Sequence, residues 1–266
     1  MSTVTSSSEA AAQTAVEIAA KTLSLPTVRS QAASLADAAA RDGATHRAYL
    51  AELLAAEVDA RHIRRRERRI KQARFPRIKT LSAFDFDAAP AVPAATVAAL
   101  ADGGWIDKGE PVVLLGDSGT GKTHLLIALG MAACEQGRSV RYLTTAQLVN
   151  ELVEAADDRQ LSRTVARYGR IELLLLDELG YLQLDARGAE LLFQVLTERE
   201  ERASVAVASN APFSEWTATF TDPRLAAAVV DRLTFNAHII QTGSDSYRLR
   251  SARAKTTTKG TATTNT

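Results

Sequence analysis

The stretch that decides the fold is VVLLGDSGTGKTHLLIAL, which runs from Val112 to Leu129. Four apolar residues come first, a turn containing three glycines follows, and a second apolar run begins directly after Lys122 and Thr123. A short apolar run that ends in a glycine turn is typical of a buried strand, and the second run is long enough for a helix. The stretch therefore predicts a strand, a tight turn and a helix in direct succession.

The turn, GDSGTGKT, matches the pattern G-x-x-x-x-G-K-[ST] of a P-loop. Glycines at this spacing let backbone N–H groups point at phosphate oxygens, and the N-terminus of a helix favours the same negative charge. We expect Lys122 to reach the β- and γ-phosphates of ATP and the Thr123 hydroxyl to bind Mg²⁺. The predicted nucleotide-binding residues of this stretch are Gly116, Asp117, Ser118, Gly119, Thr120, Gly121, Lys122, Thr123 and His124. A glycine turn without function is the alternative, and the flanking strand and helix count against it.

A second run, LLLLDE from Leu173 to Glu178, delivers two carboxylates at the end of an apolar strand. We expect Asp177 to hold the Mg²⁺ shell and Glu178 to act as the general base for an attacking water. A buried strand that ends in acids by chance is the alternative, but it weakens beside a P-loop. Paired acids therefore indicate an ATPase.

Three further apolar runs begin at Ser139, Ser204 and His238, and helix-length amphipathic segments separate them. This alternation predicts an α/β fold, a parallel sheet flanked by helices on both faces. The run SVAVASN ends in Asn210, which we expect to orient the hydrolytic water or to sense the γ-phosphate. A turn-forming asparagine is the alternative there. Packing is the simpler role for His124 and for Cys134, because no cluster of ligands surrounds either in the sequence.

Three arginines near the C-terminus are candidates for phosphate contacts. Arg232, in VVDRL, can reach across a subunit boundary to the γ-phosphate of a neighbour. Arg224, in DPRL, is the competing candidate for that role. Arg248, in DSYRLR, is a candidate for contact with the phosphates of its own subunit. For each, the alternative is an arginine on the solvated surface.

Composition indicates a soluble cytoplasmic protein of 266 residues, because the single cysteine forms no internal disulfide and no apolar run approaches the roughly 20 residues of a membrane span. The net charge of +1 conceals an asymmetry. Ten Lys and Arg stand against one Glu between Arg61 and Lys79, so that segment carries +9 and the remainder carries −8. Such segregation indicates a polyanionic partner.

The basic segment has charge on nearly every face of a predicted helix, which favours salt-sensitive, sequence-independent binding of nucleic acid. The expected nucleic acid is double-stranded DNA. An acidic protein partner is the alternative. The predicted DNA-contacting residues are Arg64, Arg65, Arg66, Arg68, Arg69, Lys71 and Arg74.

The domain boundaries follow composition. Residues 1–26 are rich in Ser, Thr and Ala and are expected to be a disordered tail, as are residues 251–266. We expect a helical N-terminal domain with a basic end at 27–74, a linker at 75–95 and the nucleotide-binding domain at 96–250.

With GDSGTGKTHL, LLLLDELGYL, ASN and DRL in this order, and with a basic linker that leads to FDF at Phe84–Phe86, the chain resembles the IstB-like helper ATPases of insertion-sequence transposons. These belong to the AAA+ class and are related to replicative helicase loaders. The resemblance implies an ATP-dependent homo-oligomer with ATP at its subunit interfaces, which binds target DNA, helps to select the insertion site and recruits or stimulates its transposase. By motif matching it assigns Arg232 as the arginine finger and Arg248 to the SYR element, and it implies little or no C-terminal lid.

Three alternatives remain at this stage. A helicase loader shares the ATPase machinery but acts on a helicase ring. A small-molecule kinase shares the P-loop but needs an acceptor pocket and a closing lid, and the acid pair favours water as the acceptor. A nucleotide-switched scaffold that does not hydrolyse ATP would lack the catalytic acid, whereas Glu178 is present.

Overall fold

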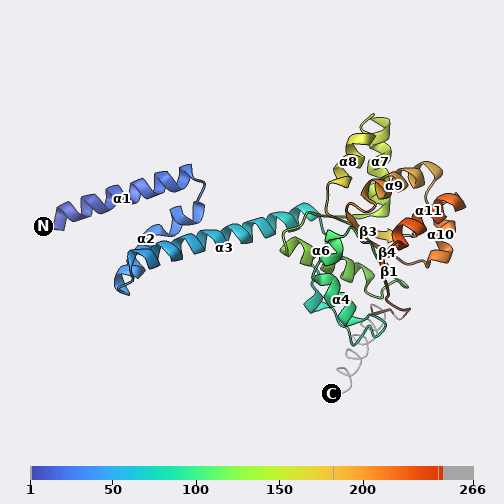
Figure 1. The fold of residues 1–266 in the computed structure, drawn as a ribbon, viewed down its shortest axis with the longest axis horizontal. Coiled ribbons are helices and arrows are strands. Elements are labelled where there is room, and N and C mark those ends of the chain that lie inside the picture. Colours follow the sequence, from blue (N-terminus) through green and yellow to red (C-terminus); the bar gives the residue numbers. More distant parts are fainter. Residues whose placement is uncertain (1, 182, 245, 248–266) are drawn as a thin grey trace, which may run out of the picture. The chain divides into compact units, whose positions relative to one another are not determined.

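The computed structural model describes residues 2–181, 183–244 and 246–247. Its contacts divide the chain into two compact units, with the boundary between Arg68 and Arg69. Three helices precede or cross that boundary (Figure 1): α1 (Ser2–Thr22), α2 (Pro26–Arg41) and α3 (His46–Ala73).

The first unit has a small apolar core made of Ala20, Val28, Ala32 and Leu53. Its most buried carboxylate is Glu57 on α3, which is only 3% exposed. One oxygen of Glu57 accepts from the backbone N–H groups of Thr27 and Val28, at 2.7 and 3.2 Å. Burial raises the pKa of Glu57, but these two N–H donors, the Thr27 side chain and the charge of Arg64 together lower it below its ordinary value. Glu57 thus satisfies free N–H groups in the first turn of α2 and fixes α2 to α3.

The expected N-terminal tail and the expected linker both contain more structure than their composition suggests. Helix α1 occupies most of the stretch expected to be a tail, consistent with its many alanines, since alanine has the highest helix propensity. Residues 75–95, expected to be a linker, pack in the second unit, where Phe75, Phe84 and Phe86 lie against the apolar core. Burial of these aromatic rings fixes a segment whose composition resembles a linker.

The second unit is built on a five-stranded parallel sheet, which confirms the predicted fold class. All five predicted strands are present, in the spatial order β2-β3-β4-β1-β5. Their bounds are β1 (Val112–Leu115), β2 (Val140–Thr144), β3 (Leu173–Leu179), β4 (Ser204–Ser209) and β5 (His238–Gln241). Strands β1 and β4 are buried along their whole length, which explains their continuous apolar sequences.

Helices cover both faces of this sheet. Val113 and Leu115 of β1 belong to one apolar cluster and Val112 and Leu114 to the other, because successive side chains point to opposite faces. One cluster contains residues of α7 (Thr145–Asp157), α8 (Leu161–Gly169), α9 (Ala186–Arg199), α10 (Trp216–Thr219) and α11 (Pro223–Thr234). The other contains residues of α4 (Ala94–Ala101), α5 (Gly104–Asp107) and α6 (Lys122–Glu135). Two 3₁₀ turns, η1 (Leu81–Ala83) and η2 (Phe213–Glu215), complete the elements that the structure assigns to its described residues.

The described residues end at Tyr247, shortly after β5, so the expectation of little or no C-terminal lid stays a prediction. In the part of the chain that the structure describes, no helix is long and apolar enough to cross a membrane.

Candidate nucleotide-binding site

The glycine turn links the end of β1 to the start of α6, as the sequence predicts. Gly116, Gly119 and Gly121 have φ values of +150°, +88° and +101°, in the region that favours glycine. A Cβ atom at Gly121 would lie 2.8 Å from the ring of Phe84, and one at Gly116 would lie 2.4 Å from Thr242 Oγ1. The turn therefore requires glycine for both its backbone shape and its close contacts.

Lys122 lies at the first position of α6 with its ammonium group inside the turn. Its Nζ donates to the carbonyl oxygens of Gly116 and Asp117, at 2.6 and 2.7 Å, and the residue is 8% exposed. A buried ammonium held by two carbonyls, at the N-terminus of a helix, is a suitable environment for phosphate oxygens. The residues present therefore fit the triphosphate of a nucleotide.

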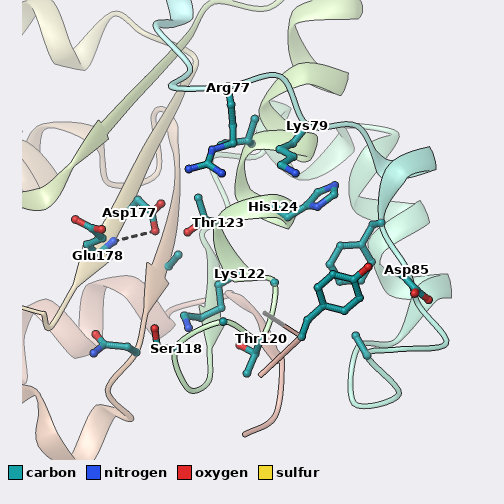
Figure 2. A pocket seen from close by; sticks show the side chains of 18 of the residues that line it. Arg77, Lys79, Asp85, Ser118, Thr120, Lys122, Thr123, His124, Asp177 and Glu178 are labelled. Carbon is teal, nitrogen blue, oxygen red and sulfur yellow. Dashed lines mark hydrogen bonds between the residues drawn. The ribbon is translucent and has the colours of Figure 1, made fainter. Parts of the chain in front are cut away.

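Asp177 and Glu178 line the same cavity as Lys122 (Figure 2). Asp177 is 4% exposed, and its Oδ1 accepts from the backbone N–H of Glu178 at 2.9 Å. Glu178 is exposed, and its φ of +61° is unusual for a residue other than glycine. The pairing of β3 with β4 is irregular between Leu176 and Leu179, so the strand bulges at the acids. Such local strain is often found at functional sites, and here it lets two consecutive carboxylates line one cavity.

A tyrosine that the sequence did not single out holds the Asp177 carboxylate. Tyr142 of β2 donates its hydroxyl to Asp177 Oδ2 at 2.8 Å, and Thr145 donates to the Asp177 carbonyl at 3.1 Å. Burial raises the pKa of Tyr142, and the negative charge of Asp177 raises it further, so the hydroxyl remains a donor. Both oxygens of Asp177 therefore have a donor that fixes their orientation.

The cavity has a volume of about 570 Å³, within the range of small-molecule sites. It brings together most of the predicted site residues, namely Ser118, Gly119, Thr120, Gly121, Lys122, Thr123, His124, Asp177, Glu178 and Asn210. Thr123 and Asp177 both line it, and hydroxyl and carboxylate oxygens are suitable Mg²⁺ ligands. Gly116 and Asp117 contribute through their carbonyls to Lys122.

His124 lines the cavity but is also engaged in packing. Its Nε2 lies 2.9 Å from the carbonyl oxygen of Thr80, and its ring meets the Phe84 ring edge-on with centroids 5.2 Å apart. Burial lowers the pKa of His124. Cys134 is fully buried on the same helix, where burial raises its pKa to about 11. Both residues pack in the way that the simpler interpretation expects.

Arg77, Lys79 and Phe84 are among the cavity residues that were not predicted as nucleotide contacts. Arg77 and Lys79 line the cavity from the basic segment, and Phe84 lines it from the FDF element. The basic run was interpreted as a surface for DNA, and Phe75-Pro76, which interrupts the predicted helix, is the one sequence signal that separates Arg77 and Lys79 from the earlier cations. The helix α3 ends before Phe75 and Pro76, and the following residues turn to the cavity.

The predicted arginine finger is engaged within its own chain. Arg232 donates to Glu200 Oε2 and to Thr197 Oγ1, both at 2.7 Å, and its guanidinium lies 4.4 Å from the centre of the Phe193 ring. Arg224 is exposed at the first turn of α11, and its side chain makes no hydrogen bond or ion pair with the residues that the structure describes. Arg248 lies outside the described residues. The choice between Arg232 and Arg224 therefore stays a prediction.

Most residues predicted to contact DNA are available at the surface of α3. Arg65, Arg68, Lys71 and Arg74 are exposed. Arg64 is also exposed but donates to Glu57 at 2.9 Å and to Thr27 at 3.2 Å. Arg64 would have to give up these two hydrogen bonds to bind a phosphate, so it is the least favourable of the predicted DNA contacts. The remaining two are Arg66, which is exposed, and Arg69, which is partly buried.

Comparison with known proteins identifies the family. Residues 18–255 match the model of the IstB-like ATP binding protein family. The chain belongs to this IstB-like family. It is 38% identical to an insertion-sequence ATP-binding protein of Sinorhizobium fredii, over 86% of this chain and 78% of that protein. It is also 38% identical to the IS21 ATP-binding protein of Pseudomonas aeruginosa, over 83% of both chains. A third relative, from Geobacillus stearothermophilus, is 35% identical over 87% of this chain and 92% of its own.

Solved structures agree with the IstB-like protein in fold. DnaA of Aquifex aeolicus, bound to AMPPCP, superposes with a TM-score of 0.55 and 22% identity, covering 68% of this chain and 55% of DnaA. The structure of DnaI superposes with a TM-score of 0.54 and 18% identity, covering 67% of this chain and 98% of DnaI. At these identities the likeness shows that the chain shares the fold of these proteins.

Proposed function

We propose that this IstB-like protein is an ATPase that assembles on target DNA and helps an insertion-sequence transposase to select and use its insertion site. The observation that carries the proposal is a single cavity lined by Lys122, Thr123, Asp177 and Glu178, in a chain whose relatives are named insertion-sequence ATP-binding proteins. Hydrolysis of ATP to ADP and phosphate would control disassembly.

Each residue of the cavity that we assign to the reaction has a distinct role. Lys122 and the glycine turn bind the triphosphate, while Thr123 and Asp177 hold Mg²⁺, which when bound neutralises charge on the phosphates. Glu178 accepts a proton from the water whose oxygen bonds to the γ-phosphorus, and the bond to the β–γ bridging oxygen breaks. Asn210 orients that water.

The proposal also requires a second protomer and DNA. An arginine of a neighbouring subunit, Arg232 or Arg224, stabilises charge on the γ-phosphate, so that assembly depends on ATP. Repetition of the basic helix along an oligomer then multiplies individually weak phosphate contacts. The transposase is the expected protein partner, and the protein is expected to act in the cytoplasm.

Light scattering of the full chain with Mg²⁺-ATP and duplex DNA tests the proposal. We expect an assembly larger than that of the protein alone, and we expect Lys122→Ala to abolish it. No increase in mass for the parent protein would refute the proposal. A pull-down that captured a replicative helicase and not the cognate transposase would instead favour the helicase-loader function.

A further inference from the structure

The segment between Ala73 and Leu81 is fixed at both ends beside the P-loop. Phe75 packs in the apolar core, and a Cβ atom added to Gly130 of α6 would lie 3.0 Å from its ring. At the other end, the carbonyl of Thr80 lies 2.9 Å from His124 Nε2. Arg77 and Lys79 lie between these two anchors, so their backbone is held at the rim of the cavity.

The side chains of Arg77 and Lys79 both line the nucleotide cavity, and Figure 2 shows them entering it from the same side. Neither makes a hydrogen bond or an ion pair with any residue in the described part of the chain. This distinguishes them from Lys122, which has carbonyl partners in the turn. Two cations without partners in a cavity that fits a triphosphate are available for an anionic ligand.

The two cations face different parts of the cavity. In Figure 2 the guanidinium of Arg77 points to the space beside Thr123 and Asp177, whereas Lys79 lies above His124. Arg77 is therefore at the end of the cavity where the metal ligands and the general base converge.

We propose that Arg77 contacts the γ-phosphate of ATP bound in its own subunit. The inference rests on the proposed nucleotide-binding function and assigns a cation of the basic segment to the nucleotide and not to DNA. A guanidinium presents donors in a fixed fork that matches phosphate oxygens. Because ADP has no γ-phosphate, the contact would let the segment that follows α3 distinguish ATP from ADP.

The test compares binding of the magnesium complexes of AMPPCP and ADP to the full chain and to Arg77→Ala. Loss of a hydrogen bond to a charged group weakens binding by roughly tenfold to a hundredfold, and we expect that loss for AMPPCP with little change for ADP. Arg163→Ala is the matched control, because Arg163 is an exposed cation of α8 that does not line the cavity and has no assigned role in binding. We expect the control to bind both nucleotides as the parent protein does.

Two results would overturn the inference. One is an equal weakening of AMPPCP and ADP binding in Arg77→Ala, which would place the guanidinium elsewhere on the nucleotide. The other is unchanged binding of both nucleotides together with weaker duplex DNA binding, which would return Arg77 to the DNA surface. Lys122→Ala separates these from failure of the proposed function: if that variant bound AMPPCP as tightly as the parent, the cavity would not be the nucleotide site.

Discussion

Removal of one hydroxyl group tests whether the carboxylate of Asp177 must be held in place. In Tyr142→Phe the ring remains in the core, but the hydrogen bond of 2.8 Å to Asp177 Oδ2 is lost. Asp177 is 4% exposed, so its Oδ2 loses a donor at a position where water has little access. A hydrogen bond to a charged group contributes about 1.5–3 kcal/mol to the free energy of unfolding. For a unit of this size, that loss lowers Tm by roughly 3–12 °C.

The functional effect is expected in the dependence on Mg²⁺. A residue that orients a metal-binding carboxylate typically changes metal affinity by about 10–100-fold when it is removed. We therefore expect Tyr142→Phe to need at least about tenfold more Mg²⁺ for half-maximal binding of a fluorescent ATP analogue. Titration of Mg²⁺ at fixed nucleotide concentration measures this, and denaturant unfolding measures the accompanying loss of stability.

The chain offers a matched control in Tyr168. Its hydroxyl donates to Glu151 Oε2 at 2.6 Å, the ring is 1% exposed, and neither residue lines the nucleotide cavity. Tyr168→Phe loses a similar bond and is expected to lower stability without a change in the Mg²⁺ dependence. If Tyr142→Phe kept the parental Mg²⁺ dependence, or if Tyr168→Phe shifted it equally, the positioning role of Tyr142 would be refuted.

Three further predictions concern the base, the core and the first unit. Glu178→Gln is expected to bind ATP and assemble but to lose turnover in a phosphate-release assay, and unchanged turnover would remove Glu178 from the mechanism. Gly130→Ala is expected to destabilise the second unit by about 1–3 kcal/mol in denaturant unfolding, because a Cβ atom would lie 2.5 Å from Leu175 Cδ1 and overpacking outweighs the helix propensity of alanine. The lowered pKa of Glu57 contributes stability that is present above its ordinary value of 4.5 and is lost as pH falls through the lowered value. Amide hydrogen exchange should therefore show loss of protection at Thr27 and Val28 in acid, and a parental acid transition in Glu57→Gln would contradict this.

The elements that the sequence predicted correctly are those whose shape is decided by neighbouring residues. The three glycines of the P-loop adopt positive φ values because of their own chemistry, and the strand before them is buried because it is apolar throughout. Asp177 and Glu178 follow the four leucines of β3 and line the same cavity as the P-loop, so their placement also follows from local sequence. Local sequence is sufficient for such features.

The elements that differed depend on contacts between residues far apart in the chain. Residues 75–95 have the composition of a linker, yet Phe84 packs against Gly121 and His124, which lie more than 30 positions later. Tyr142 became a partner of Asp177 through the pairing of β2 with β3, which places Thr144 opposite Asp177. A single sequence shows that both residues belong to strands, but it does not show that the strands are neighbours.

Arg232 illustrates the same limit for the contact between subunits that we propose. It lines a small hollow with Pro111 and Ala203, which precede β1 and β4, whereas the P-loop follows the carboxyl end of β1. Arg232 therefore lies toward the amino ends of the parallel strands, whereas its own P-loop lies at their carboxyl ends. Any contact of Arg232 with a γ-phosphate requires a second copy of the chain. In one subunit its charge is met by the exposed Glu200, in a pair of the kind that contributes about 0–1 kcal/mol, and the Thr197 hydroxyl and the Phe193 ring add further contacts. A bidentate contact with phosphate is stronger than such a pair, so under the proposed function Arg232 exchanges partners only when a neighbour presents ATP. With Arg232 as the finger, the proposed dependence of assembly on the nucleotide would follow from the modest strength of the contacts that Arg232 leaves.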